Sequence, residues 1–117
     1  MAKASVPWYS ATGNATDELV KAGYTLLHSF EVENPNTVQV YIQLFDSATV
    51  AGVTVGTTTP SQTYLVPAGD GTDNAVKVRD YADAPLRFGS GLVYAVTTDR
   101  EGNAAPDSDC PVNMTYD

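Results

Sequence analysis

Within residues 38–46, branched aliphatic residues fill every second position from 38 to 44, and this is the clearest pattern along the chain. These positions are Val38, Val40, Ile42 and Leu44. The positions between them are Gln39, Tyr41, Gln43 and Phe45. Side chains of a strand point alternately to its two faces, so a period of two predicts a β-strand with one face in the core.

A second alternating segment, residues 24–33, comes before this strand. One predicted face carries Leu26, His28, Phe30 and Val32. The other carries Leu27, Ser29, Glu31 and Glu33. Between the two segments lies Asn34-Pro35-Asn36, a turn sequence, because Pro fixes φ and Asn tolerates the left-handed region. The two segments are therefore predicted to pair as a hairpin.

Five further segments are predicted strands, and turn-rich stretches separate them. They are residues 61–66, 75–80, 84–88, 92–98 and 112–116. Two long connections, residues 47–60 and 67–75, are predicted to carry the chain between sheets. Short strands with such connections indicate an all-β fold, a small β-sandwich with Greek-key or jelly-roll-like topology.

The N-terminal residues have the least regular pattern. We expect residues 1–12 to form an irregular N-terminal arm and residues 13–117 to form a single β-sandwich domain. Within the domain, residues 16–23 fit two structures. One is a two-turn helix capped by Thr16 and ended by Gly23, and the other is a strand.

Composition agrees with a β-rich domain and restricts its partners. The 117 residues include 14 Val and 14 Thr, which favour pleated strands. Six Lys and Arg stand against 14 Asp and Glu, for a formal net charge of -8. Phosphate backbones and anionic lipid surfaces attract cations, so we expect no nucleic-acid and no membrane partner. The sequence near Met1 lacks the apolar stretch of a signal peptide, which predicts synthesis in the cytoplasm.

Reactive side chains are few. His28 is the only histidine, and its place on the predicted apolar face indicates a core or interface residue. The carboxylate pairs Asp80/Asp83 and Asp107/Asp109 stand in turn sequences, where Asp usually caps backbone amides. The chain is therefore predicted not to be an enzyme.

Two features bear on metal binding. Cys110 is the only cysteine, so neither an intrachain disulfide nor a cysteine-based metal site can form. Residues 70–74, Asp-Gly-Thr-Asp-Asn, offer oxygens that suit calcium, but they lack the spacing and the terminal Glu of an EF-hand loop. We interpret this segment as a polar loop and expect no cofactor.

Four aromatic residues do not fit a single core face. They are Trp8, Tyr9, Tyr41 and Phe45. Aromatic side chains of this kind often mark protein interfaces or carbohydrate platforms. Two interpretations stay open at this point. Either these side chains contact a partner, or both faces of the sheet are covered and the arm packs on its own domain.

Several strand and turn segments follow one another in a recognisable order. They are residues 26–36 (LLHSFEVENPN), 40–49 (VYIQLFDSAT), 55–60 (VGTTTP), 66–69 (VPAG) and 88–98 (FGSGLVYAVTT), followed by the acidic residues 107–109 (DSD). Over roughly residues 13–117 the chain resembles small virion proteins of tailed phages, which act on the capsid surface or in fibres. The resemblance implies a small β-sandwich with a structural role, and it favours a strand over a helix at residues 14–22. The insert at residues 50–53 and the loop of the 70s depart from the pattern.

The resemblance and the scarcity of reactive groups together predict a decoration (cement) protein on the capsid surface of the virion. The expected partner is the major capsid protein, and the expected assembly is a homo-oligomer, a trimer on a local symmetry axis. Trp8 and Tyr9 are the predicted anchor. Two alternatives remain: a fibre or receptor-binding module that holds a carbohydrate on surface aromatics, and a tail or neck component.

Overall fold

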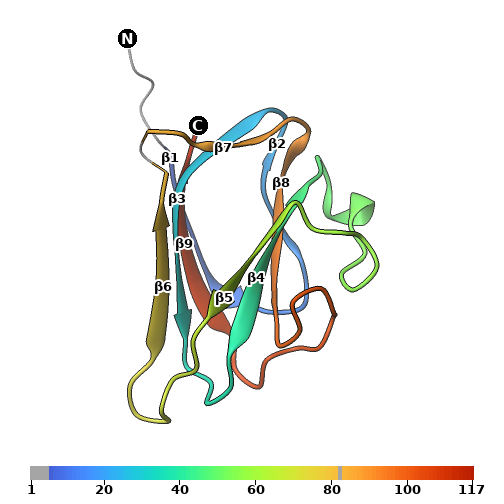
Figure 1. The fold of residues 1–117 in the computed structure, drawn as a ribbon. Helices are drawn as coiled ribbons and strands as arrows, with labels where there is room; N and C mark the ends of the chain where they lie inside the picture. The colour runs from blue at the N-terminus through green and yellow to red at the C-terminus, as the bar shows by residue number, and fades with distance from the viewer. Residues whose placement is uncertain (1–5, 82) are drawn as a thin grey trace.

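The chain folds into two antiparallel sheets that pack face to face (Figure 1). The computed structural model describes residues 6–81 and 83–117. Sheet A has the strand order β1 (Val6–Gly13), β9 (Cys110–Tyr116), β3 (Thr25–Asn34) and β6 (Ala75–Asp80), and β7 (Leu86–Phe88) also pairs with β3. Sheet B has the order β2 (Glu18–Ala22), β8 (Gly91–Thr97), β4 (Val40–Asp46) and β5 (Gln62–Val66). The predicted all-β sandwich is confirmed.

The strands form nested antiparallel pairs. β1 pairs with β9, β2 with β8, β3 with β6 and β4 with β5, so the two halves of the chain pair in reverse order. β3 also pairs with β9, and β4 with β8, which joins these pairs into two sheets. This nesting is the strand order of a jelly roll.

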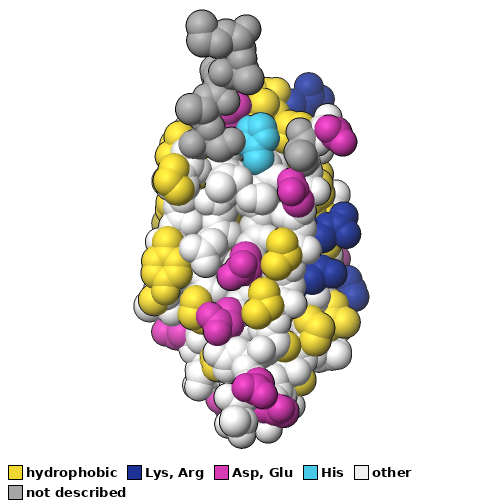
Figure 2. All heavy atoms as spheres, turned by 90° about the vertical axis from the view of Figure 1, so that its left-hand side faces the viewer, with side chains coloured by type: hydrophobic (Ala, Val, Ile, Leu, Met, Phe, Trp, Pro, Cys, Tyr) yellow, Lys and Arg dark blue, Asp and Glu magenta, His cyan; other side chains and the backbone are white. Residues whose placement is uncertain are grey.

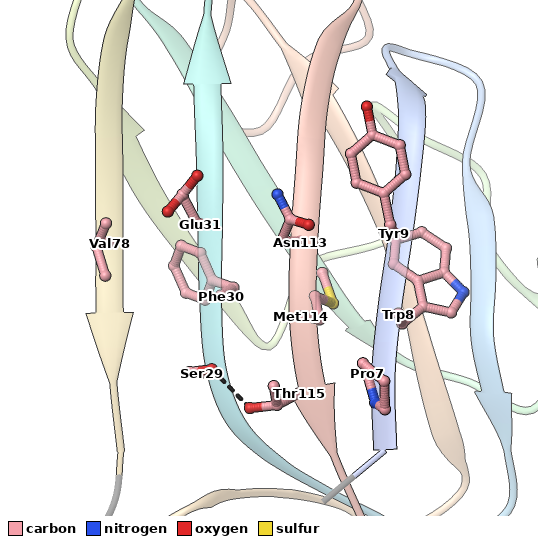
Figure 3. A pocket seen from close by; sticks show the side chains of 10 residues that line it. All are labelled: Pro7, Trp8, Tyr9, Ser29, Phe30, Glu31, Val78, Asn113, Met114 and Thr115. Carbon is pink, nitrogen blue, oxygen red and sulfur yellow. Dashed lines mark hydrogen bonds between the residues drawn. The ribbon is translucent and has the colours of Figure 1, made fainter.

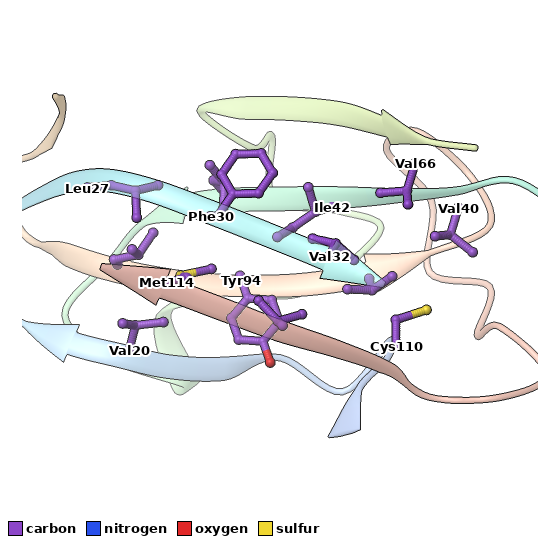
Figure 4. Packing of buried hydrophobic residues seen from close by; sticks show 14 of the residues in the cluster. Val20, Leu27, Phe30, Val32, Val40, Ile42, Val66, Tyr94, Cys110 and Met114 are labelled. Atoms are coloured by element: carbon purple, nitrogen blue, oxygen red, sulfur yellow. The ribbon is translucent and has the colours of Figure 1, made fainter. Parts of the chain in front are cut away.

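The hydrophobic core lies between the two sheets (Figure 4). Val40, Ile42 and Leu44 of β4 are fully buried, as their alternation predicted. From the other strands come Leu27, Phe30, Val32, Val66, Leu92, Tyr94, Val96, Val112 and Met114. Burying one such side chain contributes about 1.5–3 kcal/mol, so these positions supply most of the driving force for folding.

The predicted hairpin between residues 24–33 and 38–46 is wrong. β3 belongs to sheet A and β4 to sheet B, so residues 35–39 carry the chain across the sandwich. Buried amides stabilise this crossing. Asn34 Nδ2 donates to the carbonyl of Pro67, and Asn36 Nδ2 donates to the carbonyl of Ser108, both at 2.9 Å. These two hydrogen bonds link three connecting segments of the chain, and the local turn sequence does not reveal them.

β3 changes face at a β-bulge around His28. Its register with β9 shifts between the pairs Leu27–Tyr116 and Ser29–Thr115. One extra residue reverses the alternation, so Leu27 and Phe30 both enter the core. The predicted apolar face that included Leu26 and His28 is therefore wrong in its first half.

Residues 6–13 form the strand β1, which pairs with β9 at the edge of sheet A, with a register shift between Ser10 and Gly13. The prediction of an irregular arm over residues 1–12 is wrong for this part, because β1 belongs to the sandwich. Residues 1–5 of the predicted arm lie outside the described residues. Residues 18–22 form β2, so for residues 16–23 the strand interpretation is confirmed and the helix is wrong.

Residues 47–60 cover part of the outer face of sheet B. They connect β4 to its neighbour β5, so the predicted crossing between sheets is wrong here, whereas the connection after β5 does cross to sheet A. The segment contains the 3-10 turn η1 (Val50–Gly52) and packs Val53 against Phe45 and its neighbours. Among residues 6–81 and 83–117, no helix is long and apolar enough to cross a membrane.

Candidate functional site

The outer face of sheet A carries a shallow trough of about 400 Å³ (Figure 3). Its floor is formed by the adjacent strands β1, β9, β3 and β6. Phe30 and Met114 touch the trough from beneath, because both belong to the core on the other side of the strands. The surface therefore rests directly on the packed interior, which holds it in shape.

Strand register aligns the outward residues of the trough in two rows. The first row, across β1, β9, β3 and β6, is Tyr9, Asn113, Glu31 and Val78. The second row is Pro7, Thr115 and Ser29, and Asp80 of β6, which pairs with Ser29, continues it outside the trough. Neighbouring strands lie about 4.8 Å apart, so each row spans roughly 14 Å. The topology brings four segments that are distant in sequence into one surface.

Large apolar side chains stand at the ends of the first row. Tyr9 is 59% exposed and Val78 is 58% exposed. The residues between them are polar, and in the second row Ser29 Oγ and Thr115 Oγ1 share a hydrogen bond of 2.6 Å. Exposed apolar side chains on a rigid sheet, with polar groups beside them, are typical of an interaction surface.

The charged residue that lines the trough, Glu31, is acidic, and acidic residues lie beside the trough. Glu31 lies in the first row and Asp80 ends the second, and Glu33 is the next outward residue of β3. Figure 2 shows Asp and Glu in the middle of this face, with Lys and Arg at one margin. Arg79 of β6 lies over the ring of Tyr64, 5.1 Å from its centroid. A face of this charge favours a ligand that carries positive charge.

The predicted anchor residues Trp8 and Tyr9 lie on opposite sides of β1. Tyr9 points outward into the trough. Trp8 is half-buried, and its ring meets the ring of Tyr94 edge to face, with 5.4 Å between the centroids. Trp8 therefore packs on its own domain, and Tyr9 remains a candidate contact residue.

The other two predicted interface residues, Tyr41 and Phe45, belong to sheet B and lie away from the trough. Phe45 is only 1% exposed and packs with Val53, so it is unavailable to a partner. Tyr41 is half-buried, and the guanidinium of Arg100 lies 4.7 Å from the centroid of its ring. Loops of the chain itself therefore cover Tyr41 and Phe45 on the outer face of sheet B, which is the second of the two interpretations left open by the sequence.

The sequence reasoning missed Glu31, Val78 and Asn113 as members of one surface. Glu31 and Asn113 stand at outward positions of predicted strands, so alternation placed their side chains near solvent. The alternation of residues 75–80 placed Val78 on the apolar face, yet Val78 is exposed in the structure. Whether these three side chains come together depends on which strands are neighbours in the sheet. A local sequence pattern does not contain that information.

The reactive groups named from the sequence do not converge. His28 is half-buried, and its Nε2 lies 3.3 Å from Asp117 Oδ2 near the C-terminus. Asp109 Oδ1 accepts a hydrogen bond from Asn14 Nδ2 at 2.9 Å. Within the described part of the chain, no group of three His, Cys, Asp or Glu side chains is arranged to hold a metal ion.

Asp70 organises the loop at residues 70–74. Its Oδ1 accepts the backbone N–H of Asp73 at 2.6 Å and of Thr72 at 2.8 Å. These bonds, the one from Asp73 first, lower the pKa of Asp70 below its ordinary value. The carboxylate caps amides of its own loop, which is the polar-loop geometry that the sequence favoured.

Comparison with known proteins gives no family assignment. No protein-family model matches the chain, and no curated protein matches it.

Proposed function

We propose that this chain is a non-catalytic structural protein of a tailed-phage virion, which binds the outer capsid surface as a decoration (cement) protein. Two observations support the proposal. Residues 26–36, 40–49 and 88–98 resemble segments of small virion proteins. In addition, the outer face of sheet A has a shallow trough and carries exposed apolar side chains.

The observation that carries the proposal is the exposure of Tyr9 and Val78 on strands of the sheet itself. Strands packed on a core hold these side chains in place, so binding requires little ordering of the surface. Exposed apolar groups with polar neighbours have the composition of a protein–protein contact. Such a face suits a repeated protein lattice, such as a shell of the major capsid protein.

The proposed location is the virion surface, and the proposed partner is the major capsid protein. A capsid offers local symmetry axes, and a small protein that occupies one binds as a homo-oligomer, for which we propose a trimer. The net charge of -8 keeps the outward surface solvated and makes coated particles repel one another.

The test is co-sedimentation of the purified chain with capsids of its phage that lack it. Replacing Tyr9 and Val78 together by Ser should weaken capsid binding at least about tenfold, because the exposed apolar contacts are lost. The matched control replaces Tyr24 and Val38 by Ser, which are 54% and 51% exposed and lie outside the trough. Full binding by the first variant, or an equal loss in the control, contradicts the assignment of this face.

A fibre or receptor-binding module that holds a carbohydrate is the second candidate function. Tyr9 presents an exposed ring, and the amide of Asn113 lies beside it in the same row. A ring surface with adjacent hydrogen-bonding groups suits a sugar. Glycan-array binding that disappears in the Tyr9→Ser variant, together with absent capsid binding, would favour this candidate.

A further inference from the structure

Most tyrosines of this chain are already paired with a charged group of the chain. Lys or Arg side chains lie over the rings of Tyr41, Tyr64, Tyr81 and Tyr116, between 4.7 and 5.9 Å from the centroids. The hydroxyl of Tyr94 donates to Glu18 Oε2 at 3.0 Å. In the described residues, no cation lies over the exposed ring of Tyr9. Tyr9 therefore offers an unused site for a cation.

Glu31 stands in the same row as Tyr9 and is likewise unused. No hydrogen bond or salt bridge between described residues involves its carboxylate, whereas the neighbouring Glu33 accepts from Asn74. One strand, β9, separates Tyr9 from Glu31, which places their backbones roughly 9.6 Å apart. Asn113 of β9 lies between them. A ring, an amide and a carboxylate thus stand in one row on the outer face of sheet A.

We propose that this trough binds the side chain of an arginine from a protein partner. The inference rests on the proposed function, in which the capsid surface supplies the arginine. The planar guanidinium stacks on the ring of Tyr9 and donates two hydrogen bonds to the carboxylate of Glu31. The side-chain oxygen of Asn113 accepts a third. Arginine fits better than lysine because its planar fork serves the ring and the carboxylate together.

Charge and shape favour arginine over the other occupants. A second copy of this face would bring Glu31 and Asp80 against the same acids, and like charges repel. A neutral sugar makes no favourable electrostatic interaction with the negative charge of this face. It also finds a single exposed ring, because the ring of Trp8 packs against Tyr94 on the core side. An arginine uses the ring, the carboxylate and the amide at once.

The direct test is an NMR titration of the purified, isotope-labelled chain with blocked Gly-Arg-Gly, Gly-Lys-Gly and Gly-Gln-Gly tripeptides. The Arg peptide should shift the signals of Tyr9 and Asn113 saturably and bind about tenfold more tightly than the Gln peptide. Added salt should weaken the binding, since the trough is exposed. Glu31→Gln should abolish the preference for Arg. Glu101→Gln, an exposed carboxylate outside the trough, should leave it unchanged.

Three results would overturn the arginine site: equal binding of the Arg and Gln peptides, undiminished Arg binding by Glu31→Gln, or shifts caused by chitobiose and not by the Arg peptide. Capsid co-sedimentation separates this inference from the proposed function. If the chain binds the Arg peptide but not the capsid, the arginine site is supported and the decoration role is rejected. Full capsid binding by Glu31→Gln rejects the arginine site alone.

Discussion

Glu18 joins the two sheets on the side where β1 and β2 meet. Its Oε1 accepts hydrogen bonds from Ser10 Oγ at 3.0 Å and Thr12 Oγ1 at 2.8 Å. Its Oε2 accepts from the hydroxyl of Tyr94 at 3.0 Å. An ionised carboxylate only accepts, so it satisfies all three hydroxyl donors. Burial first, and then the charge of Glu18, raise the pKa of Tyr94, which keeps that donor protonated.

Glu18→Gln should lower the free energy of unfolding by about 1–3 kcal/mol, because an amide cannot replace both carboxylate oxygens as acceptors. Urea unfolding followed by tryptophan fluorescence measures the change, since the only tryptophan, Trp8, lies on Tyr94. Glu101→Gln, in an exposed loop, is the matched control and should change the stability by less than about 0.5 kcal/mol. Identical midpoints for the two variants would show that the bonds to Glu18 contribute nothing.

At the scale of elements, the existence of most strands was predictable and their pairing was not. The strands at residues 61–66, 75–80, 84–88, 92–98 and 112–116 were all predicted, and the structure has strands within each of these segments. Alternation and turn residues are local signals, so they locate a strand without naming its neighbour. The turn at residues 34–36 looked like a hairpin loop because its contacts to Pro67 and Ser108 come from distant segments.

Deleting residues 1–12 should destabilise the domain by about 3 kcal/mol or more, because it removes almost all of β1 and the buried face of Trp8. It also removes Ser10 and Thr12, two of the donors to Glu18. Thermal unfolding followed by circular dichroism measures the loss. Deleting residues 1–5, which leaves β1 whole, is the comparison variant and should lower the midpoint less than deleting residues 1–12. A truncated chain without residues 1–12 that unfolds like the wild type would contradict the place of β1 in the sandwich.

At the scale of the whole molecule, the nested pairing makes the trough a property of the complete domain. β1 and β9 come from the two ends of the described chain and lie side by side (Figure 1). The acidic face of Figure 2 is therefore assembled from residues that are up to about a hundred positions apart. The net charge of -8 predicted an acidic surface, and the topology decided that Glu31 lies near Tyr9.

Stability should fall between about pH 9 and pH 12. Burial, with a smaller contribution from Asp109, raises the pKa of Cys110 from 9.0 to about 11, and burial raises that of Tyr81 from 10.0 to about 12. The folded chain holds these protons more tightly than the unfolded chain. The stabilisation is therefore complete below pH 9 and is lost as the pH rises through the folded pKa values. Urea unfolding midpoints at pH 8, 9, 10, 11 and 12 measure the effect.

The matched variant Cys110→Ala should reduce the fall in stability between pH 9 and pH 11 and leave the later fall, which belongs to Tyr81 and Tyr94. A wild-type midpoint that stays constant from pH 8 to pH 11 would contradict the raised pKa of the Cys110 thiol.

The sequence by itself determined that this chain is an all-β protein, that Val40, Ile42 and Leu44 lie in its core and that its surface is acidic. These properties follow from alternation, turn residues and composition, which are local or additive. The tertiary structure decided the strand pairing, the bulge at His28 and the placement of Tyr9 and Glu31 in one row of the same face. These depend on contacts such as the one between Asn36 and Ser108, which are 72 positions apart, and no local pattern encodes such a contact.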